Sequence, residues 1–408
     1  LRSKYAGVEW RGAAAVFAPD PKVWYPFLEP VMTRLATRVR WWQLGNDLDT
    51  SFVTSVDPAA KLKEVKAELD RIGQDVNVGI AWPWLHELPP TGKQPPPWRF
   101  LAFSAEPVLT AEELATYLDA SKGVSASRWV VLEPLSITDY SADVRATDLV
   151  FRMMAAKMHG ADAIFCPDPF NDERGLMNRD GTPGELLMPW RVASLALGGA
   201  NHLGSIDLPN GSPNQVFGKG QEAVMIVWAW RPTEEVIHLG SKARQVDLWG
   251  HETPLRTQEG RQVIEVTRAP TFVTGLDASI ARWQMNCRFA QEKLPSVSAA
   301  PHPNSCTFQN TFDRGIAGQA TIIAPEGWNI QPSQITFRLA EGESMKQPFT
   351  ITLPFDATTG RHPVRIDFEI QTTPSEKFSV FRNFDVGLGV VHIEVEARLN
   401  DQGELEVV

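Results

Sequence analysis

Two carboxylates follow stretches of sequence that are typical of buried strands. Asp47 comes after the apolar residues 39–44, and Glu133 comes directly after the apolar residues 129–132. Strands of a parallel α/β sheet or barrel present their carboxyl ends at one edge, so both side chains are expected over the same mouth. Such a pair can hydrolyse a glycosidic bond, one carboxyl group protonating the leaving oxygen and the other attacking the sugar or activating water.

Each carboxylate also has a structural interpretation. Gly45, Asn46 and Asp47 are turn residues, so this stretch is equally compatible with an Asx turn that caps a helix. The structural interpretation of Glu133 is that its carboxylate caps the segment after its strand. A glutamate is nevertheless costly at the end of so apolar a strand unless it is paired or functional.

Aromatic residues and a histidine lie at the end of a second predicted strand. Trp82, Trp84 and His86 are candidates to line a sugar subsite, because an exposed indole offers a flat apolar face to a sugar ring. Packing in the core is the alternative for these residues.

Asp168 follows the last strand of this region, with Asp172 and Glu173 behind it. These carboxylates are candidates to bind substrate or a cation, and turn chemistry explains them as well. The histidines at 202, 238 and 251 show no ligand spacing, and residues 171–181 lack the EF-hand pattern, so no metal is expected. The sequence contains neither a phosphate loop nor a dinucleotide fingerprint, and no cofactor is expected.

Alternating helices and strands must position these residues. Apolar spacing predicts helices over 20–38, 58–72, 143–159 and 184–199, and another that begins at Thr110; strands are predicted over 39–44, 76–82, 98–104, 129–135 and 161–170. This alternation indicates a parallel α/β sheet or barrel. Five strands are predicted between residues 39 and 170, whereas a full barrel has eight.

The chain of 408 residues is too long for one core, so several domains are expected. Short, closely spaced strands from residue 222 onward indicate an antiparallel β-sandwich. A linker over 295–305 and a second run of short strands indicate an immunoglobulin-like sandwich. The predicted domains are 1–210, the C-terminal part of a (β/α)8 barrel; 211–282, a β-sandwich; 283–385, an Ig-like β-sandwich; and 386–408, the start of a further β domain.

The charge and composition of the chain limit the classes of molecule that it is expected to bind. The net charge is −10 and no Lys/Arg-rich run is present, which argues against nucleic acid or an anionic membrane surface. No apolar run approaches the length of a membrane span. Fourteen Trp against four Tyr favour carbohydrate as a partner, although Trp is also a core residue.

The three cysteines are Cys166, Cys287 and Cys306, which form neither a disulfide framework nor a zinc site. Cys287 and Cys306 are open to two interpretations, a pair in an oxidising compartment or two unrelated buried thiols. The N-terminus lacks an initiator Met and an apolar signal region, which is consistent with a processed or partial chain. The sequence therefore does not identify the compartment.

Residues 39–200 resemble the C-terminal five strands of a clan A glycoside hydrolase barrel. In that clan strand 4 ends in Asn-Glu, whose Glu is the acid/base, and strand 7 ends in the nucleophilic Glu. Asn46 and Asp47 match the first motif, with Asp in place of Glu, and Glu133 matches the second. The resemblance implies that Asn46 hydrogen-bonds the sugar hydroxyl next to the reacting carbon. It implies no cofactor.

The resemblance extends beyond the barrel. It implies a following β-sandwich, as in family 39-like members, which residues 222–278 supply. Residues 310–372 resemble the immunoglobulin-like module often attached to α-galactosidases. These domain types favour an extracytoplasmic location.

Two departures from the family pattern matter. Asp47 is one methylene shorter than the expected Glu, and misplacement on that scale can cost about 100-fold in rate. Strands 1 to 3 have no counterpart here. The resemblance therefore implies either a piece of a larger enzyme, joined to further domains of the same parent chain, or an incomplete barrel whose open edges something covers.

The first hypothesis is a retaining glycoside hydrolase acting on an oligo- or polysaccharide, with Glu133 as nucleophile and Asp47 as acid/base. It predicts that the two carboxyl groups lie about 5–5.5 Å apart. The alternative is a non-catalytic carbohydrate-binding or surface protein with a degenerate barrel. A third hypothesis is a scaffold in a larger assembly, with the open barrel edge covered by a partner.

Overall fold

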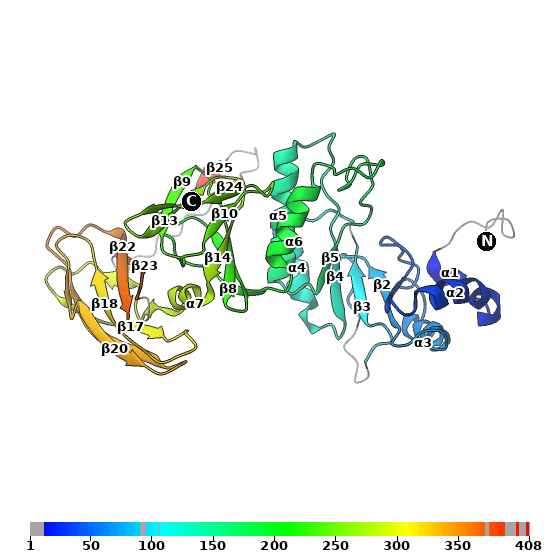
Figure 1. The fold of residues 1–408 in the computed structure, drawn as a ribbon, viewed down its shortest axis with the longest axis horizontal. Coiled ribbons are helices and arrows are strands. Elements are labelled where there is room, and N and C mark those ends of the chain that lie inside the picture. Colours follow the sequence, from blue (N-terminus) through cyan, green and yellow to red (C-terminus); the bar gives the residue numbers. More distant parts are fainter. Residues whose placement is uncertain are drawn as a thin grey trace. The chain divides into compact units, whose positions relative to one another are not determined.

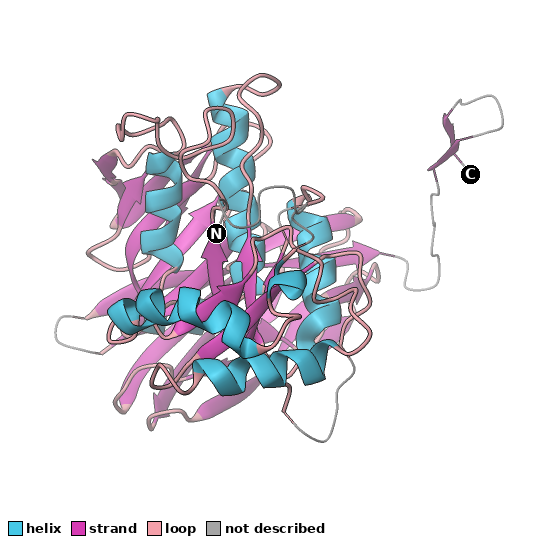
Figure 2. Ribbon diagram, turned by 90° about the vertical axis from the view of Figure 1, so that its right-hand side faces the viewer, coloured by secondary structure: helices cyan, strands magenta, loops and turns pink. Residues whose placement is uncertain are grey.

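The computed structural model describes residues 12–89, 95–104, 106–371 and 375–387, and the backbone of two further short strands near the C-terminus. Contacts divide the chain into two compact units, Leu1–Gly198 with Leu248–Gly250, and Gly199–Asp247 with His251–Val408. The first unit contains long helices and a parallel sheet, and the second contains mostly strands (Figures 1 and 2). The chain is thus a multidomain, β-rich protein.

A five-stranded parallel sheet is the centre of the first unit. Its strands are β1 (Trp41–Leu44), β2 (Asn77–Trp82), β3 (Phe100–Phe103), β4 (Ser127–Val131) and β5 (Ala163–Phe165). Each strand pairs in parallel with the next, in the order β1-β2-β3-β4-β5. The five predicted strands are therefore present as a half-barrel. Among the described residues β1 and β5 remain edge strands, so a closed barrel is not confirmed.

The predicted helices of this unit are present, with bounds that differ from the prediction by a few residues. They are α2 (Pro21–Leu35), α3 (Pro58–Leu69), α4 (Ala111–Ala120), α5 (Ala142–Met158) and α6 (Leu187–Leu197), with the short α1 (Ala13–Val16) and a 3-10 turn, η1 (Ser121–Gly123). Asp20 caps α2 by accepting from the Lys22 amide, and Thr110 and Glu113 form a capping box at α4. Thr110 is the residue at which the sequence predicts the beginning of a helix.

The apolar stripe predicted along α2 is only partly buried. Trp24 is buried, as expected, but Phe27 is 42% exposed and Val31 is 50% exposed. Residue spacing identifies one face of a helix, but it does not show whether another element lies against that face.

The parallel sheet is strongly curved. Trp41 on β1 and Trp129 on β4 have ring centroids 5.4 Å apart, although two strands separate them in the sheet. In a flat sheet, strands three positions apart lie roughly 14 Å from each other. Phe100 on β3 stacks on Trp129 at 3.7 Å and lies 5.7 Å from Trp41, so the three rings fill the concave face.

Gly79 on β2 makes room for this stack. A Cβ atom at Gly79 would lie 2.3 Å from the ring of Phe100, which is fully buried. The register pairs Gly79 with Phe100 on one side and with Gln43 on the other, so all three residues share one face of the sheet. A residue without a side chain at this position lets the Phe100 ring lie across β2.

The second unit begins with two antiparallel sheets, which form the predicted β-sandwich. One has the order β11-β10-β14-β8-β7-β6 and the other the order β12-β13-β9. Their strands are β6 (Asn201–Gly204), β7 (Asn214–Lys219), β8 (Glu222–Val227), β9 (Thr233–Ile237), β10 (Arg244–Val246), β11 (Glu252–Pro254), β12 (Arg256–Gln258), β13 (Arg261–Val266) and β14 (Thr271–Asp277). Because β6 pairs with β7, residues before 210 belong with this unit. The finer domain division stays a prediction.

Two further sheets follow, with the orders β15-β17-β21-β19 and β16-β23-β22-β18-β20. Their strands are β15 (Arg288–Phe289), β16 (Lys293–Pro295), β17 (Pro301–Gln309), β18 (Ile316–Ile323), β19 (Asn329–Gln331), β20 (Gln334–Leu339), β21 (Ser344–Thr352), β22 (Gly360–Ile370) and β23 (Glu376–Gly387). The predicted start of a further β domain, residues 386–408, falls largely outside the described residues; β24 (Ala397–Leu399) and β25 (Leu405–Val407) pair antiparallel.

A helix that the sequence analysis missed, α7 (Ala278–Asn286), joins these sandwiches. Its Trp283 is fully buried among phenylalanines of the Ig-like core, including Phe308 and Phe368. Arg382 on β23 donates to the carbonyl oxygens of Gln284 and Cys287 at the end of α7, and also pairs with Asp207 at 3.0 Å. One buried guanidinium therefore connects three distant segments of the second unit.

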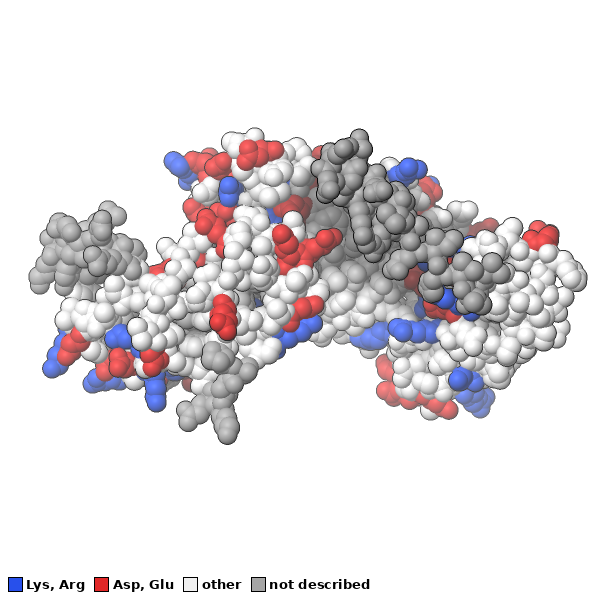
Figure 3. Space-filling view, turned by 180° about the vertical axis from the view of Figure 1, so that it is seen from behind, with Lys and Arg blue, Asp and Glu red and all other residues white. Residues whose placement is uncertain are grey.

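Among the described residues, no helix has the length and apolar character needed to cross a membrane. On the face drawn in Figure 3, basic side chains lie interspersed with acidic ones.

Replacing Gly79 with alanine is expected to destabilise the first unit by about 1–3 kcal/mol, because the new methyl group overlaps the Phe100 ring. Urea unfolding followed by Trp fluorescence measures the loss. Gly123→Ala is the matched control, since a Cβ there meets nothing within 4 Å. Equal stability of the two variants would contradict the proposed role of Gly79 in the aromatic stack.

Candidate active site

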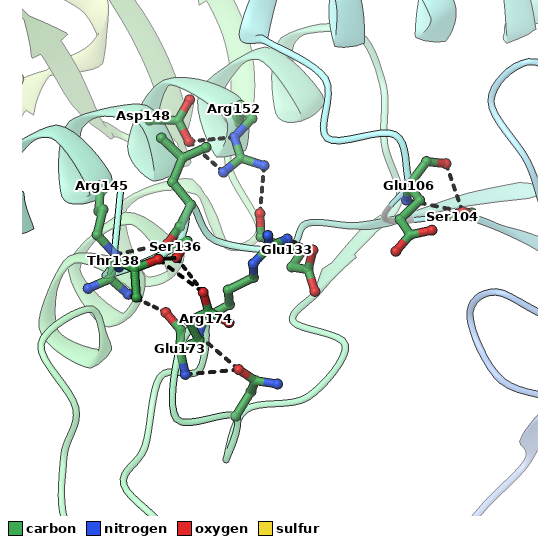
Figure 4. Close-up of polar contacts among 12 residues, drawn as sticks. Ser104, Glu106, Glu133, Ser136, Thr138, Arg145, Asp148, Arg152, Glu173 and Arg174 are labelled. Carbon is green, nitrogen blue, oxygen red and sulfur yellow. Dashed lines mark hydrogen bonds and ion pairs between the residues drawn. The ribbon is translucent and has the colours of Figure 1, made fainter. Parts of the chain in front are cut away.

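Glu133 leaves the end of β4 and forms an ion pair. Its Oε2 accepts a hydrogen bond from Nη1 of Arg174 at 2.6 Å (Figure 4). The pair is partly exposed, and the carboxylate raises the pKa of Arg174 through this hydrogen bond and through its charge. Glu133 therefore does not cap a helix; the N-cap of the following helix, α5, is Ser141.

The backbone of Glu133 is held by a buried arginine of α5. Arg152 is 2% exposed and donates from Nη1 to the Glu133 carbonyl oxygen at 2.9 Å. Its Nε donates to Asp148 on the same helix at 2.8 Å. Burial raises the pKa of Asp148, and the Arg152 charge and hydrogen bonds oppose that rise. Arg152 thus fixes the strand end from which the Glu133 side chain projects.

The loop that carries Arg174 is tied to the loop after β4. The Glu173 carboxylate accepts from the Ser136 hydroxyl at 2.7 Å and from the Thr138 hydroxyl at 3.1 Å, and these bonds lower its pKa. Arg145, which is buried, donates to the Leu135 carbonyl oxygen at 2.9 Å and to that of Glu173 at 3.4 Å. Figure 4 shows this network beside the Glu133–Arg174 pair, whose geometry it restrains.

Asp47 and Asn46, which follow β1, differ in burial and in hydrogen-bond partners. Asp47 is half-buried and its Oδ1 accepts from Nε2 of Gln43 at 2.9 Å. Asn46 is exposed, and its Oδ1 accepts from the Leu48 amide at 3.0 Å, which is the Asx turn left open by the sequence. This turn does not begin a helix. The Asn46 amide group remains a donor for a ligand.

Asp49 has a structural role in the same loop. Its carboxylate accepts from the amides of Ala13 and Ser51 at 2.6 and 2.9 Å. Gly45 has φ +94°, and a Cβ there would lie 2.6 Å from Oδ2 of Asp49. Glycine is therefore required for both the turn and the close approach.

The thiol of Cys166, directly after β5, is influenced by the charges of three of the predicted carboxylates. The pKa of this thiol is raised to about 12, chiefly by burial and also by the charges of Asp168, Glu133 and Asp47, while a hydrogen bond from the Asp168 backbone opposes the rise. Such charge effects are strong only at short range. The charges of carboxylates after β1, β4 and β5 thus all act on one thiol. Their catalytic and binding roles stay predictions.

The predicted aromatic subsite lies elsewhere. Trp82 and Trp84 are buried, at 4% and 6% exposure. Trp84 stacks on Phe103 at 4.7 Å. Trp82 pairs with Phe103 across the sheet, and both lie on the face opposite to Phe100 because successive strand residues alternate between faces. The structure does not bring these two tryptophans to Glu133.

Trp82 and His86 instead line a separate cavity of about 990 Å³ together with Trp98 and Lys63. Helix α3 precedes β2 and helix α4 follows β3. The described residues between β2 and β3 form no helix. Among the described residues no helix covers this part of the sheet, and the buried Trp82 and Trp98 line the cavity there.

Sequence reasoning missed Gln43, Arg152 and Arg174. Arg174 directly follows Asp172 and Glu173, which the sequence did mark as candidates, so its place after the last strand was the available signal. Arg152 carries no such signal, because an arginine in an amphipathic helix is normally placed on the solvated face.

No protein-family model matches this chain. No curated protein matches it either.

Several solved structures resemble parts of the chain at low scores. A family 39 glycoside hydrolase from the gut symbiont Bacteroides cellulosilyticus WH2 has a TM-score of 0.43 and 14% identity, over 61% of this chain and 60% of that chain. A FixG-related protein from Vibrio parahaemolyticus has a TM-score of 0.20 and 8% identity, over 25% of this chain and 94% of that chain. The E. coli chaperone DraB has a TM-score of 0.20 and 14% identity, over 28% and 64%.

This chain thus spans 60% of the length of the glycoside hydrolase structure. All three similarities are too low to carry a conclusion about activity.

Replacing Arg152 with methionine is expected to destabilise the first unit by about 2–3 kcal/mol, because Asp148 stays partly buried without its partner. Loss of the guanidinium raises the Asp148 pKa further above its unfolded value of about 3.9. The folded state then binds the proton more tightly, so this stability is present below the unfolded pKa and lost as pH rises through the folded pKa. Urea unfolding should show a larger difference from wild type near neutral pH than in acid.

The double variant Arg152→Met/Asp148→Leu removes the unpaired charge as well. It is expected to recover part of the lost stability and most of the pH dependence. A difference from wild type that is the same in acid and at neutral pH would contradict the role given to Asp148.

The thiol of Cys166 should react slowly with iodoacetamide at neutral pH. With a pKa of about 12, its rate near pH 8 is expected to be on the order of 1,000-fold below that of an ordinary cysteine, because only the thiolate reacts. The rate should rise about tenfold per pH unit toward the pKa. Peptide mass spectrometry follows this residue separately from the other two cysteines.

Removal of each neighbouring charge should lower the Cys166 pKa and speed the reaction at fixed pH. Asp168→Asn, Glu133→Gln and Asp47→Asn are the variants, and Glu112→Gln, on the exposed face of α4, is the control. An Asp47→Asn rate equal to the control would show that Asp47 does not lie near this thiol.

Proposed function

We propose that the first unit hydrolyses glycosidic bonds of an oligo- or polysaccharide with retention of configuration. The observation that carries this proposal is the carboxylate of Glu133, which leaves the end of a parallel strand, is paired with Arg174 at 2.6 Å, and shares the surroundings of Cys166 with Asp47. Two carboxyl groups at the carboxyl ends of different strands of one curved sheet are the groups this reaction requires.

Glu133 is proposed as the nucleophile. A nucleophile must be a carboxylate, and the ion pair with Arg174 presents it in that form. The buried Arg152 and the Glu173 network support the role, because an attacking oxygen must be held in a fixed geometry.

Asp47 is proposed as the acid/base. In the first step the Glu133 oxygen bonds to the anomeric carbon, the glycosidic C–O bond breaks, and Asp47 gives its proton to the leaving oxygen. In the second step Asp47 takes a proton from water, the water oxygen bonds to the anomeric carbon, and the bond to Glu133 breaks. Retention requires the two carboxyl groups about 5–5.5 Å apart.

The Gln43 amide supports the role of Asp47, because it hydrogen-bonds one carboxyl oxygen and orients the side chain. Asn46, through its free amide group, and Asp168 are proposed to bind hydroxyl groups of the sugar. Trp82 and His86 are proposed to contact a longer substrate through the separate cavity, whereas Trp84 stacks on Phe103 and is proposed only to support that region. The domain types keep an extracytoplasmic location as part of the proposal.

Glu133→Gln is expected to lower kcat on activated aryl glycosides by at least about 100-fold, because the amide cannot form the covalent intermediate. Asp47→Asn should slow substrates with poor leaving groups far more than 4-nitrophenyl glycosides, which need no proton. A panel of 4-nitrophenyl glycosides is the assay, and NMR of the first-formed anomer reads the stereochemistry.

Glu112→Gln, on the exposed face of α4, is the matched control and should keep wild-type rates. Turnover that survives Glu133→Gln, or a first-formed product of inverted configuration, would overturn the proposal.

A second function, sugar binding without turnover, is favoured by one observation. On the concave face Trp41 and Phe165 are 42% and 41% exposed and flank the stacked rings of Phe100 and Trp129. Exposed aromatic faces bind sugar rings without any chemistry. Oligosaccharide binding by calorimetry that Glu133→Gln leaves unchanged, with no turnover by wild type, distinguishes this function from the first.

A further inference from the structure

Cys287 and Cys306 lie side by side in the core of the Ig-like module. Their Sγ atoms are 3.7 Å apart, and both residues are fully buried. The structure holds both residues as free, buried thiols, as one interpretation expects, but the two are not unrelated, because the fold places them in direct contact.

The strand register explains the contact. β15 pairs antiparallel with β17, with Phe289 opposite Cys306 and Arg288 opposite Thr307. Cys287 comes one residue before β15, so it lies diagonally across from Cys306. Residues two positions apart in a strand share a face, and diagonal neighbours on a shared face are within reach of each other.

We propose that Cys287 and Cys306 form a structural disulfide when the chain folds in the presence of a small-molecule disulfide such as oxidised glutathione. One thiolate attacks the glutathione disulfide and releases one reduced glutathione. The second protein thiolate then attacks the mixed disulfide and releases the other, so two protein thiols are oxidised and one disulfide is reduced to two thiols.

The bond needs only a small movement of the side chains. Closing the sulfur atoms from 3.7 Å to a bond length of about 2.05 Å requires them to approach by roughly 1.7 Å. No intervening strand separates the two residues, since β15 and β17 are direct neighbours.

Oxidation must precede complete burial. In the folded state neither thiol is exposed, and the hydrogen bond with Cys287 and burial both raise the pKa of Cys306, which suppresses the reactive thiolate. A partly folded chain, in which β15 and β17 have paired but the second sheet has not closed over them, still exposes both thiols.

The disulfide would anchor the end of α7. The Cys287 carbonyl oxygen already accepts from Arg382 at 2.9 Å, and its amide bonds to the Trp283 carbonyl oxygen. A covalent bond to β17 would close a short loop and restrict the unfolded chain. The oxidised protein is therefore expected to unfold at a temperature roughly 5–10 °C higher than the reduced protein.

The test uses the full chain, unfolded in denaturant with reductant and refolded either with oxidised glutathione or with reductant present. Thiols are then alkylated in denaturant and located by peptide mass spectrometry. The expected result is that only Cys166 is alkylated after oxidative refolding, that residues 287 and 306 appear in one cross-linked peptide, and that all three cysteines are alkylated after reductive refolding.

Cys166→Ser is the control and should leave the cross-linked peptide unchanged, whereas Cys287→Ala should abolish it. The same alkylation of chain secreted through an oxidising compartment serves if refolding fails. Three free thiols, glutathione attached at residue 287 or 306, or a cross-link to Cys166 would each overturn the proposal.

Discussion

The stacking of three aromatic rings on one face of a parallel sheet requires strands that are distant in sheet order to curve toward each other. Trp41 and Trp129 meet across two intervening strands, and Gly79 leaves the space in which Phe100 joins them. The candidate site depends on the same curvature. Without it, a charge beyond the end of β1 would lie farther from Cys166, directly after β5, and would influence its thiol less.

Three arginines hold the loops and side chains at the end of the curved sheet in a defined arrangement. Arg152 and Arg145 project from α5 and donate to backbone carbonyl oxygens at the ends of the neighbouring loops, and Arg174 completes the arrangement by pairing with Glu133. The planar guanidinium presents several donors in fixed directions, so one buried side chain can hold two segments at once. Lysine at these positions would keep the charge but lose that geometry.

The extent to which the sequence predicts this arrangement follows from the range of the forces involved. Alternating apolar stretches and caps such as Thr110 with Glu113 are local signals, and the five strands and the helices of the first unit were accordingly predicted. The carboxylates at strand ends follow from the same local pattern. Which residues contact them does not, because the Arg174–Glu133 pair joins positions 41 residues apart.

The face on which a side chain lies was harder to predict than the position of its helix or strand in the sequence. Trp82 was correctly placed at a strand end but points to the outer face, and the stripe on α2 was recognised while its exposure was not. Helix α7 was missed in the sequence analysis, although its apolar residues contribute to two cores. The proximity of the two buried cysteines likewise depends on a strand pairing that spacing alone does not specify.

The contacts of Arg382 can form only late in synthesis. Helix α7 and Cys287 leave the ribosome 95 residues before the arginine that binds their carbonyl oxygens, and Asp207 leaves 175 residues before it. At translation rates of about 5–20 residues per second, the end of α7 waits on the order of 5–20 seconds for its partner. During that interval the segment that joins the sandwiches exists with exposed carbonyl oxygens, and it is complete only when β23 has been made.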